Sequence, residues 1–235
     1  MKGKVSKNKF LKVVLPALLV VAIICQAVGF QAVLAKGNVA TTSSDSISNL
    51  TDQQLQALTN PILQSYKADS SHKVWKMTDD SRLAVLANQT NIENARLQEV
   101  VKLVNSEFVE KEIISSPLAM VYAQEKDVSY GDILIDIDQT SSITSSSNSK
   151  EAYKITIGEN GVRLTGASEN AIMHGLRTIQ NLIITNDGLV YGEIVDYPNV
   201  AERRVHVDCA RKYISKDWFI RQIREMSYMK MNALQ

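Results

Sequence analysis

The expected fold depends on one stretch near the C-terminus, Val205-His-Val-Asp-Cys-Ala-Arg211-Lys-Tyr213. Residues 205–209 are short and β-branched, which is typical of a buried strand. Ser215 then offers a hydroxyl to the free amides of a helix start. The apolar residues behind it recur at helical spacing: Phe219, Ile223, Met226 and Met229. A strand, a short turn and an amphipathic helix are half of a β/α/β unit, and ligands bind at the C-terminal end of such strands, where Arg211 lies.

Upstream, the clearest local structure is a hairpin followed by a helix. Residues 153–157 and 162–164 alternate apolar and polar side chains, and Asn160-Gly161 between them suits the positive φ of a hairpin turn. Ser168 is expected to begin a helix. Its apolar face is predicted to consist of Ile172, Leu176, Ile179 and Ile183.

A second helix and several further strands are predicted before this hairpin. Thr90 to Glu93 resembles a capping box, in which both side chains bond to free amides of a helix start. The helix behind it would bury Leu97, Val101, Val104 and Phe108. Further strands are expected near Trp75 and over 83–86, 118–123, 132–137 and 189–195. These elements predict an α/β fold class, specifically a small α+β sandwich over residues 73–197 with two helices on one face of a sheet.

Residues 1–35 have the composition of a secretion signal. A lysine-rich start precedes an apolar core from Val13 to Cys25, and Val33-Leu-Ala35 supplies small residues for cleavage after Ala35. We therefore expect a secreted protein. An uncleaved membrane anchor remains the alternative, because the wider apolar run reaches Leu34. Residues 36–72 are polar and rich in serine and threonine, which predicts a flexible leader.

The composition gives no reason to expect a nucleic-acid partner. The net charge is +1, and taking away the five lysines of residues 1–35 leaves −4. Cys209 is the one cysteine after the signal, which rules out an intramolecular disulfide, and its place in the expected strand predicts a buried, inert thiol. Asp132 and Asp136 are expected on a solvated strand face instead of in a metal site. His174 has no second ligand one turn away, and no phosphate-binding loop occurs, so we expect no metal and no cofactor.

Two sets of motifs resemble glycoside hydrolase family 20. Asp208-x-x-Arg211-Lys-Tyr, with a helix closing in Lys230-Met-Asn232, is similar to the start of that family's catalytic barrel. Gly161-Val-Arg-Leu-Thr-Gly166 and Ala171-Ile-Met-His-Gly-Leu-Arg-Thr178 resemble a hairpin and helix of the small domain before the barrel. The family comprises β-N-acetylhexosaminidases and lacto-N-biosidases.

The resemblance implies that residues 198–235 begin a (β/α)8 barrel that is truncated after Gln235, since a full barrel takes about 250 residues. In the family the substrate's own 2-acetamido group attacks, assisted by an adjacent Asp-Glu pair. No Asp-Glu pair follows Arg211, so we expect the pair beyond Gln235 and no hydrolysis by this chain.

The resemblance also assigns a role to Arg211, which would bind the hydroxyls of the terminal sugar. A guanidinium can donate to two neighbouring oxygens at a fixed geometry. The alternative is a structural ion pair with a nearby carboxylate. Asp208 is expected to be a buried structural acid.

The expected function is therefore that of the N-terminal part of a secreted β-N-acetylhexosaminidase. Its partner would be a carbohydrate substrate with a terminal β-linked N-acetylhexosamine. The alternative is a non-catalytic extracellular α/β module that binds a glycan or a partner protein.

Overall fold

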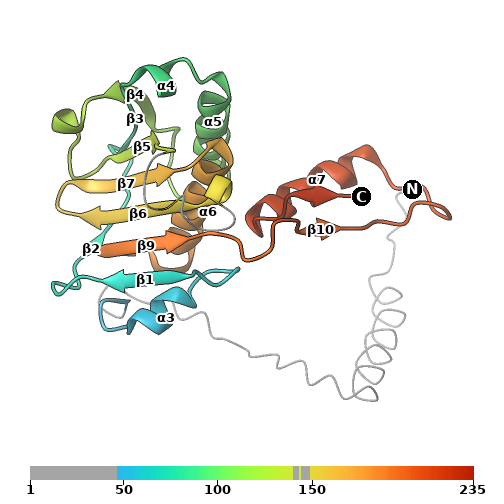
Figure 1. Cartoon of the computed structure of the whole chain (residues 1–235), viewed down its shortest axis with the longest axis horizontal. Helices are drawn as coiled ribbons and strands as arrows, with labels where there is room; N and C mark the ends of the chain where they lie inside the picture. Colours follow the sequence, from blue (N-terminus) through green and yellow to red (C-terminus); the bar gives the residue numbers. More distant parts are fainter. Residues whose placement is uncertain (1–46, 140–142, 144–148) are drawn as a thin grey trace, which may run out of the picture. The chain divides into compact units, whose positions relative to one another are not determined.

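The computed structural model describes residues 47–139, 143 and 149–235 (Figure 1). The signal predicted over 1–35, its cleavage after Ala35 and the start of the predicted leader lie outside these residues. Within the described ranges, no helix is both long enough and apolar enough to cross a bilayer.

Seven strands of the described chain form one mixed sheet in the order β1-β9-β6-β7-β5-β3-β4. Strands β3, β4, β5 and β7 are parallel to one another, whereas β6 is antiparallel to β7 and β9, and β1 is antiparallel to β9. The strands are β1 Ser65–Ala68, β3 Arg82–Leu86, β4 Ala119–Ala123, β5 Ile133–Ile137, β6 Tyr153–Gly158, β7 Gly161–Gly166 and β9 Gly192–Asp196. A separate antiparallel pair is made by β2 Val74–Trp75 and β8 Leu189–Val190.

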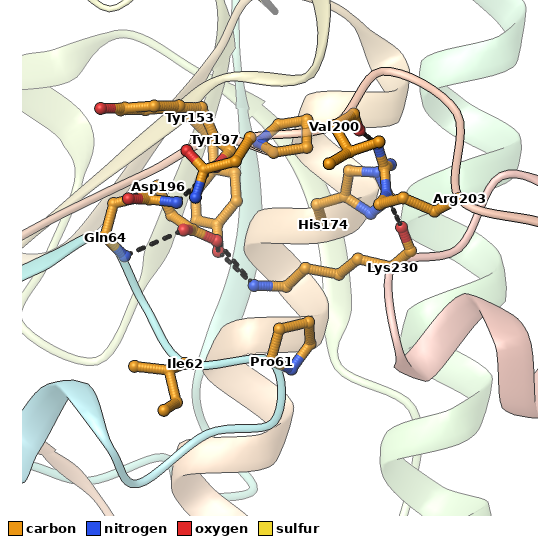
Figure 2. Close-up of a pocket in the computed structure, with 12 residues that line it drawn as sticks. Pro61, Ile62, Gln64, Tyr153, His174, Asp196, Tyr197, Val200, Arg203 and Lys230 are labelled. Atoms are coloured by element: carbon orange, nitrogen blue, oxygen red, sulfur yellow. Dashed lines mark hydrogen bonds and ion pairs between the residues drawn. The ribbon is translucent and has the colours of Figure 1, made fainter.

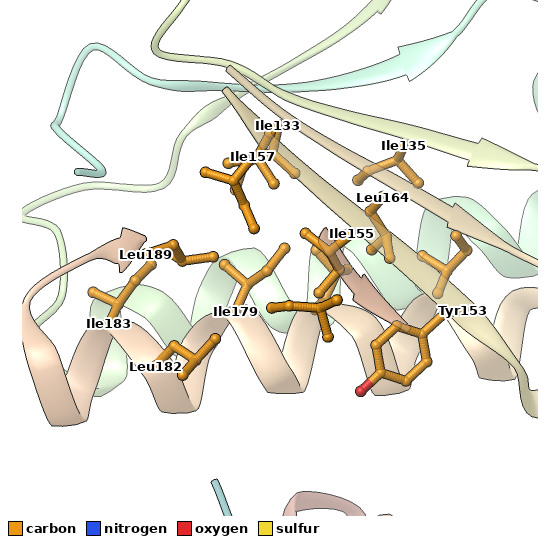
Figure 3. Packing of buried hydrophobic residues seen from close by; sticks show 14 of the residues in the cluster. Ile133, Ile135, Tyr153, Ile155, Ile157, Leu164, Ile179, Leu182, Ile183 and Leu189 are labelled. Carbon is orange, nitrogen blue, oxygen red and sulfur yellow. The ribbon is translucent and has the colours of Figure 1, made fainter. Parts of the chain in front are cut away.

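Two long helices, α5 Ala95–Glu110 and α6 Glu169–Asn186, pack on one face of this sheet (Figure 1). The apolar faces predicted for both helices are buried. Figure 3 shows side chains of α6 meeting those of β5, β6 and β7 in the core. Each buried aliphatic side chain contributes about 1.5–3 kcal/mol. This arrangement confirms the predicted sheet with two helices. The short helices are α3 Asp52–Gln56 and α4 Gln89–Ile92, and the 3-10 turns are η1 Glu125–Asp127 and η3 Ser149–Glu151.

The hairpin turn is as predicted, with Gly158 paired to Gly161. Gly161 has φ +89°, and a Cβ there would lie 2.6 Å from the Asp132 carbonyl oxygen. The strand expected over 189–195 is broken in two. Tyr191 lies between β8 and β9, Gly192 begins β9 at φ +147°, and the two halves join different sheets.

The flexible leader predicted through residue 72 is wrong in its described part. Ser65–Ala68 form the edge strand β1, which pairs with β9. Leu55, Leu63 and Tyr66 are buried in the core, and the Tyr66 hydroxyl donates to the Val190 carbonyl at 2.7 Å. The polar residues around them conceal this pattern, because three apolar side chains spread over twelve positions show no clear period.

The capping box predicted at Thr90 is also wrong. Asn88 caps the single turn α4, and Asn94 caps α5 by accepting from the Leu97 amide at 2.9 Å. Asparagine is as good a cap as threonine, and the chain turns between the two helices after Ile92.

The C-terminal residues form a parallel β/α/β unit. Strand β10 Arg204–Val205 is joined to β11 Ala233–Leu234 through helix α7 Lys216–Tyr228. Ser215 caps α7 as predicted, accepting from the Trp218 amide at 3.2 Å. The strand is shorter than the expected 205–209. Among the described residues β10 pairs with β11 alone, and Asp208 and Cys209 are exposed, so their predicted burial is wrong.

Candidate functional site

The parallel strands β10 and β11 place their C-terminal ends at one edge. Arg204 is opposite Ala233 and Val205 opposite Leu234. The pairing continues beyond the strands, with the Val207 amide donating to the Gln235 carbonyl at 2.8 Å. Residues 208–213, which we name the 208–213 loop, therefore begin where ligands bind in parallel α/β folds.

The 208–213 loop presents its two basic side chains, Arg211 and Lys212, to solvent. Asp208 accepts from the Ala210 amide at 2.8 Å, which is a turn-forming contact within the loop. Arg211 is exposed, and Tyr213 retains 91% of its accessible surface. In the described part of the chain, no carboxylate lies within ion-pair distance of the Arg211 guanidinium. The structural ion pair considered for Arg211 is thus absent among these residues.

The opposite end of the β/α/β unit is attached to the sandwich by buried charged groups, which Figure 2 shows. Lys230 is the second residue after α7, and its Nζ lies 2.8 Å from both Asp196 Oδ2 and the Tyr153 hydroxyl. Tyr153 in turn donates to Asp196 at 2.7 Å. We name Lys230, Asp196 and Tyr153 the Lys230 cluster. The Gln64 amide donates to the other Asp196 oxygen at 3.1 Å, so both oxygens of this carboxylate are satisfied.

Burial governs the ionisation of the Lys230 cluster. It lowers the pKa of Lys230, while the adjacent Asp196 carboxylate acts in the opposite direction. It also raises the pKa of Tyr153 well above the ordinary value, and the negative charge of Asp196 adds to this effect. The tyrosine therefore stays a neutral donor, and the ion pair is formed by Lys230 and Asp196.

A second set of contacts surrounds Arg203, just before β10. Its Nη2 lies 2.8 Å from Glu151 Oε2, and its Nε donates to the Lys230 carbonyl at 2.7 Å. Asn232 accepts from the Arg203 amide at 2.9 Å and donates to the Ala201 carbonyl at 2.8 Å. The starts of β10 and β11 are thereby held at one place.

Glu151 is the acidic centre of this second set. Burial raises its pKa, but His174 and Arg203 beside it outweigh that effect and hold the pKa at about 2. His174 Nε2 lies 3.7 Å from Glu151 Oε1, which is beyond hydrogen-bond range. Glu151 thus remains a carboxylate throughout the physiological pH range.

Cavities lie on both sides of these contacts. One of about 260 Å³ is lined by Pro61, Ile62, Pro198 and Val200 together with Lys230 (Figure 2). Another of about 470 Å³ lies between Met173 and the residues around Met226. His174 lines both cavities and is 8% exposed. Apolar packing between the sandwich and the β/α/β unit is therefore incomplete.

A family model described as glycosyl hydrolase family 20, domain 2, matches residues 61–197. The chain belongs to glycosyl hydrolase family 20. The match begins before β1, which agrees with the early start of the sheet and not with the domain boundary expected at residue 73.

Related proteins are much longer than this family 20 chain. The β-hexosaminidase B of Pseudoalteromonas piscicida is 31% identical over 83 residues, which are 35% of this chain and 11% of that protein. The solved chitobiase of Flavobacterium johnsoniae has a TM-score of 0.61 at 18% identity, covering 79% of this chain and 27% of the other. The exo-β-N-acetylglucosaminidase of Vibrio harveyi, solved in complex with N-acetylglucosamine, has a TM-score of 0.55 at 15% identity, covering 79% and 26%. At these identities the solved structures establish the shared fold.

Sequence reasoning about this family 20 chain misplaced two acids. Asp132 and Asp136 are buried, not solvated. Arg82 Nε lies 2.9 Å from Asp132 Oδ1, and Arg163 Nη2 lies 3.3 Å from Asp136 Oδ2. Burial raises the pKa of Asp132, yet Arg82 and the donors of Ser129 lower it overall. Within the described ranges, no three His, Cys, Asp or Glu residues are grouped so that they could hold a metal ion.

The Lys230 cluster was not foreseen. Lys230 occurs in the motif that closes the C-terminal stretch, whereas Asp196 lies 34 positions earlier and outside that motif. The one available signal was a lysine two residues after an amphipathic helix, a position that is usually exposed to solvent.

Proposed function

We propose that this chain is the N-terminal part of a β-N-acetylhexosaminidase that removes terminal β-linked N-acetylhexosamine. Its sandwich would precede a catalytic (β/α)8 barrel of which β10, α7 and β11 are the first unit. The observation that carries the proposal is the parallel β/α/β unit directly after the domain matched by the family model, with Arg211 exposed at its C-terminal edge. The greater length of the relatives supports a continuation beyond residue 235.

Arg211 is the proposed sugar-binding residue. A planar guanidinium can donate to two adjacent hydroxyls of the terminal sugar, and its exposure at the strand edge supports this role. The reaction would be substrate-assisted: the 2-acetamido oxygen attacks the anomeric carbon while a glutamic acid protonates the leaving oxygen. A neighbouring aspartate would orient the acetamido group and stabilise the developing positive charge.

The catalytic Asp-Glu pair would lie beyond residue 235 in the longer protein. No Asp-Glu dipeptide follows Arg211 in the sequence. The 235 residues alone would therefore not hydrolyse a glycoside. Sequencing the gene further should reveal the pair about 100–150 residues on, given the size of such barrels.

We also propose that the protein is exported, with residues 1–35 removed after Ala35. The lysine-rich start and the apolar core of residues 13–25 support this step. N-terminal sequencing of the protein from the culture medium should begin at Lys36. An N-terminus at residue 1 in a membrane fraction would instead indicate an anchored form.

The activity is tested with the full-length gene product and p-nitrophenyl N-acetyl-β-glucosaminide. The full-length product should release p-nitrophenol, and Arg211→Lys should raise KM. Arg221→Lys, an exposed arginine on α7, is the matched control and should leave KM unchanged. A full-length product that binds N-acetylhexosamine glycans without cleaving them would instead support the non-catalytic module.

A further inference from the structure

We propose that Lys230 is a positioning residue, whose buried ion pair with Asp196 sets the place of the 208–213 loop and thus of Arg211. The position of the loop is an inference from contacts within this chain. Its consequence for sugar binding rests on the proposed function.

The first argument is the way in which the pair closes a loop of chain. Asp196 is the last residue of β9, where the chain leaves the sandwich, and Lys230 is the second residue after α7, where it returns. The ion pair joins the two points, which are 34 positions apart and bracket β10, the 208–213 loop and α7. Holding both ends of an excursion restricts everything between them.

The second argument is burial. The side chains of Lys230 and Asp196 are 9% and 8% exposed. A buried ammonium is costly unless it is paired and hydrogen-bonded, and Lys230 donates to both Asp196 and Tyr153. The lysine therefore favours one orientation of the β/α/β unit on the sandwich. In another orientation its buried charge would have no partners.

The third argument is that the backbone of Lys230 lies between the start of β10 and the start of β11. Lys230 has φ +54°, a left-handed turn that reverses the chain after α7. Its carbonyl accepts from Arg203 Nε, and Arg203 itself precedes β10. One residue thus links the sandwich, the start of β10 and the approach to β11. The direction of β10 determines where its C-terminal end, with Arg211, is placed.

The fourth argument is the incomplete packing around these contacts. Open pockets of about 260 and 470 Å³ flank the interface, so apolar packing between the unit and the sandwich is not continuous there. The directional polar contacts of Lys230 and Arg203 therefore contribute to the orientation of the unit. A charged, hydrogen-bonded cluster is expected to restrict the unit to a narrow range of orientations, because hydrogen bonds weaken steeply with misalignment.

The test compares Lys230→Met with Lys216→Met in the full-length gene product. Methionine keeps the length of the lysine side chain and removes its charge, and Lys216 is an exposed lysine at the other end of α7. Amide hydrogen exchange is followed by mass spectrometry. In Lys230→Met, peptides from 203–235 should exchange at least about tenfold faster, while β5, β6 and β7 keep their protection. Lys216→Met should match the parent.

Asp196→Asn is the second variant, in case Lys230→Met does not fold. Asparagine keeps the shape but has one acceptor oxygen, so it cannot accept from Gln64 at one position and from Tyr153 and Lys230 at the other, as the carboxylate does. It also removes the counter-charge of the buried ammonium, so the same peptides should again exchange faster. Unchanged exchange over 203–235 in both variants would overturn the proposal. A uniform increase that includes β5 to β7 would also overturn it, because Lys230 would then be a general stability residue.

Kinetics then separate this proposal from the proposed function. If Arg211 binds sugar, Lys230→Met should raise KM for the chromogenic substrate with kcat little changed, as expected when ground-state binding is lost. An equal KM in variant and parent, despite faster exchange, would overturn the link to Arg211. If the parent itself does not hydrolyse the substrate, the proposed function fails, and the exchange result still decides the positioning of the loop.

Discussion

Arg177 of α6 forms a buried ion pair with Glu107 of α5. The guanidinium Nη2 lies 3.0 Å from Glu107 Oε1, and Nη1 contacts the second carboxylate oxygen. The Tyr228 ring of α7 covers the guanidinium at 4.1 Å. Burial lowers the pKa of Arg177, yet the group remains charged because its ordinary pKa is so high. Three helices therefore meet at one cation.

Replacing Arg177 by methionine should strongly destabilise the fold. The change leaves the Glu107 carboxylate buried without its partner, which costs about 3–5 kcal/mol. Urea unfolding gives the free energy of unfolding. The double variant Arg177→Met with Glu107→Leu should recover part of the loss, because both charges are then removed. A double variant less stable than the single one would contradict this account.

Gly161→Ala should destabilise the hairpin by more than about 1 kcal/mol. The positive φ and the closeness of the Asp132 carbonyl both disfavour a Cβ at this position. Gly158→Ala is the matched control at the other end of the same turn, since nothing lies within 4 Å of a Cβ there. Thermal unfolding of the two variants compares them directly, and equal melting temperatures would argue against strain at residue 161.

Acid should weaken the contacts around Glu151. Its folded pKa of about 2 is below the ordinary 4.5, so the unfolded chain binds the proton first. The stabilising contribution is full above about pH 4.5 and is lost as the pH falls towards 2. Glu151→Gln should therefore be less stable than the parent at pH 6, and the two free energies of unfolding should converge near pH 2. Parallel curves would show that Glu151 does not titrate in this way.

Arg211→Lys should leave stability unchanged and still impair sugar binding. The side chain is exposed, so the free energy of unfolding should change by less than about 0.5 kcal/mol. Losing a charge-assisted contact costs about 1.5–3 kcal/mol, which corresponds to roughly a tenfold to hundredfold rise in KM for the full-length enzyme. Paired unfolding and kinetic measurements test both halves, and a large loss of stability would indicate a structural role.

The elements that could be predicted are those specified by neighbouring residues. The hairpin at Asn160-Gly161 and the helix after Ser168 each depend on contacts within a few positions, and both formed as expected. Their apolar spacing also identified the core faces correctly. One of the two motif sets that carried the family resemblance lies in these stretches, and the family is confirmed.

The features that were missed depend on partners far away in the chain. Tyr66 lies in a polar stretch, yet its strand joins the sheet by pairing with β9 and its side chain lies in the core. Asp132 is buried because Arg82 meets it, although alternation alone suggested a solvated face. The pairing of Lys230 with Asp196 is of the same kind. Local periodicity carries no information about which distant charge a side chain will meet.

The pairing of β1 with β9 sets an order of events during synthesis. Ser65 is opposite Val195, so β1 leaves the ribosome about 130 residues before its partner strand. Until β9 is synthesised, β1 has no strand to pair with, so this edge of the sheet forms late. In a nascent chain stopped before residue 192, the strand that contains Tyr66 would lack its pairing partner.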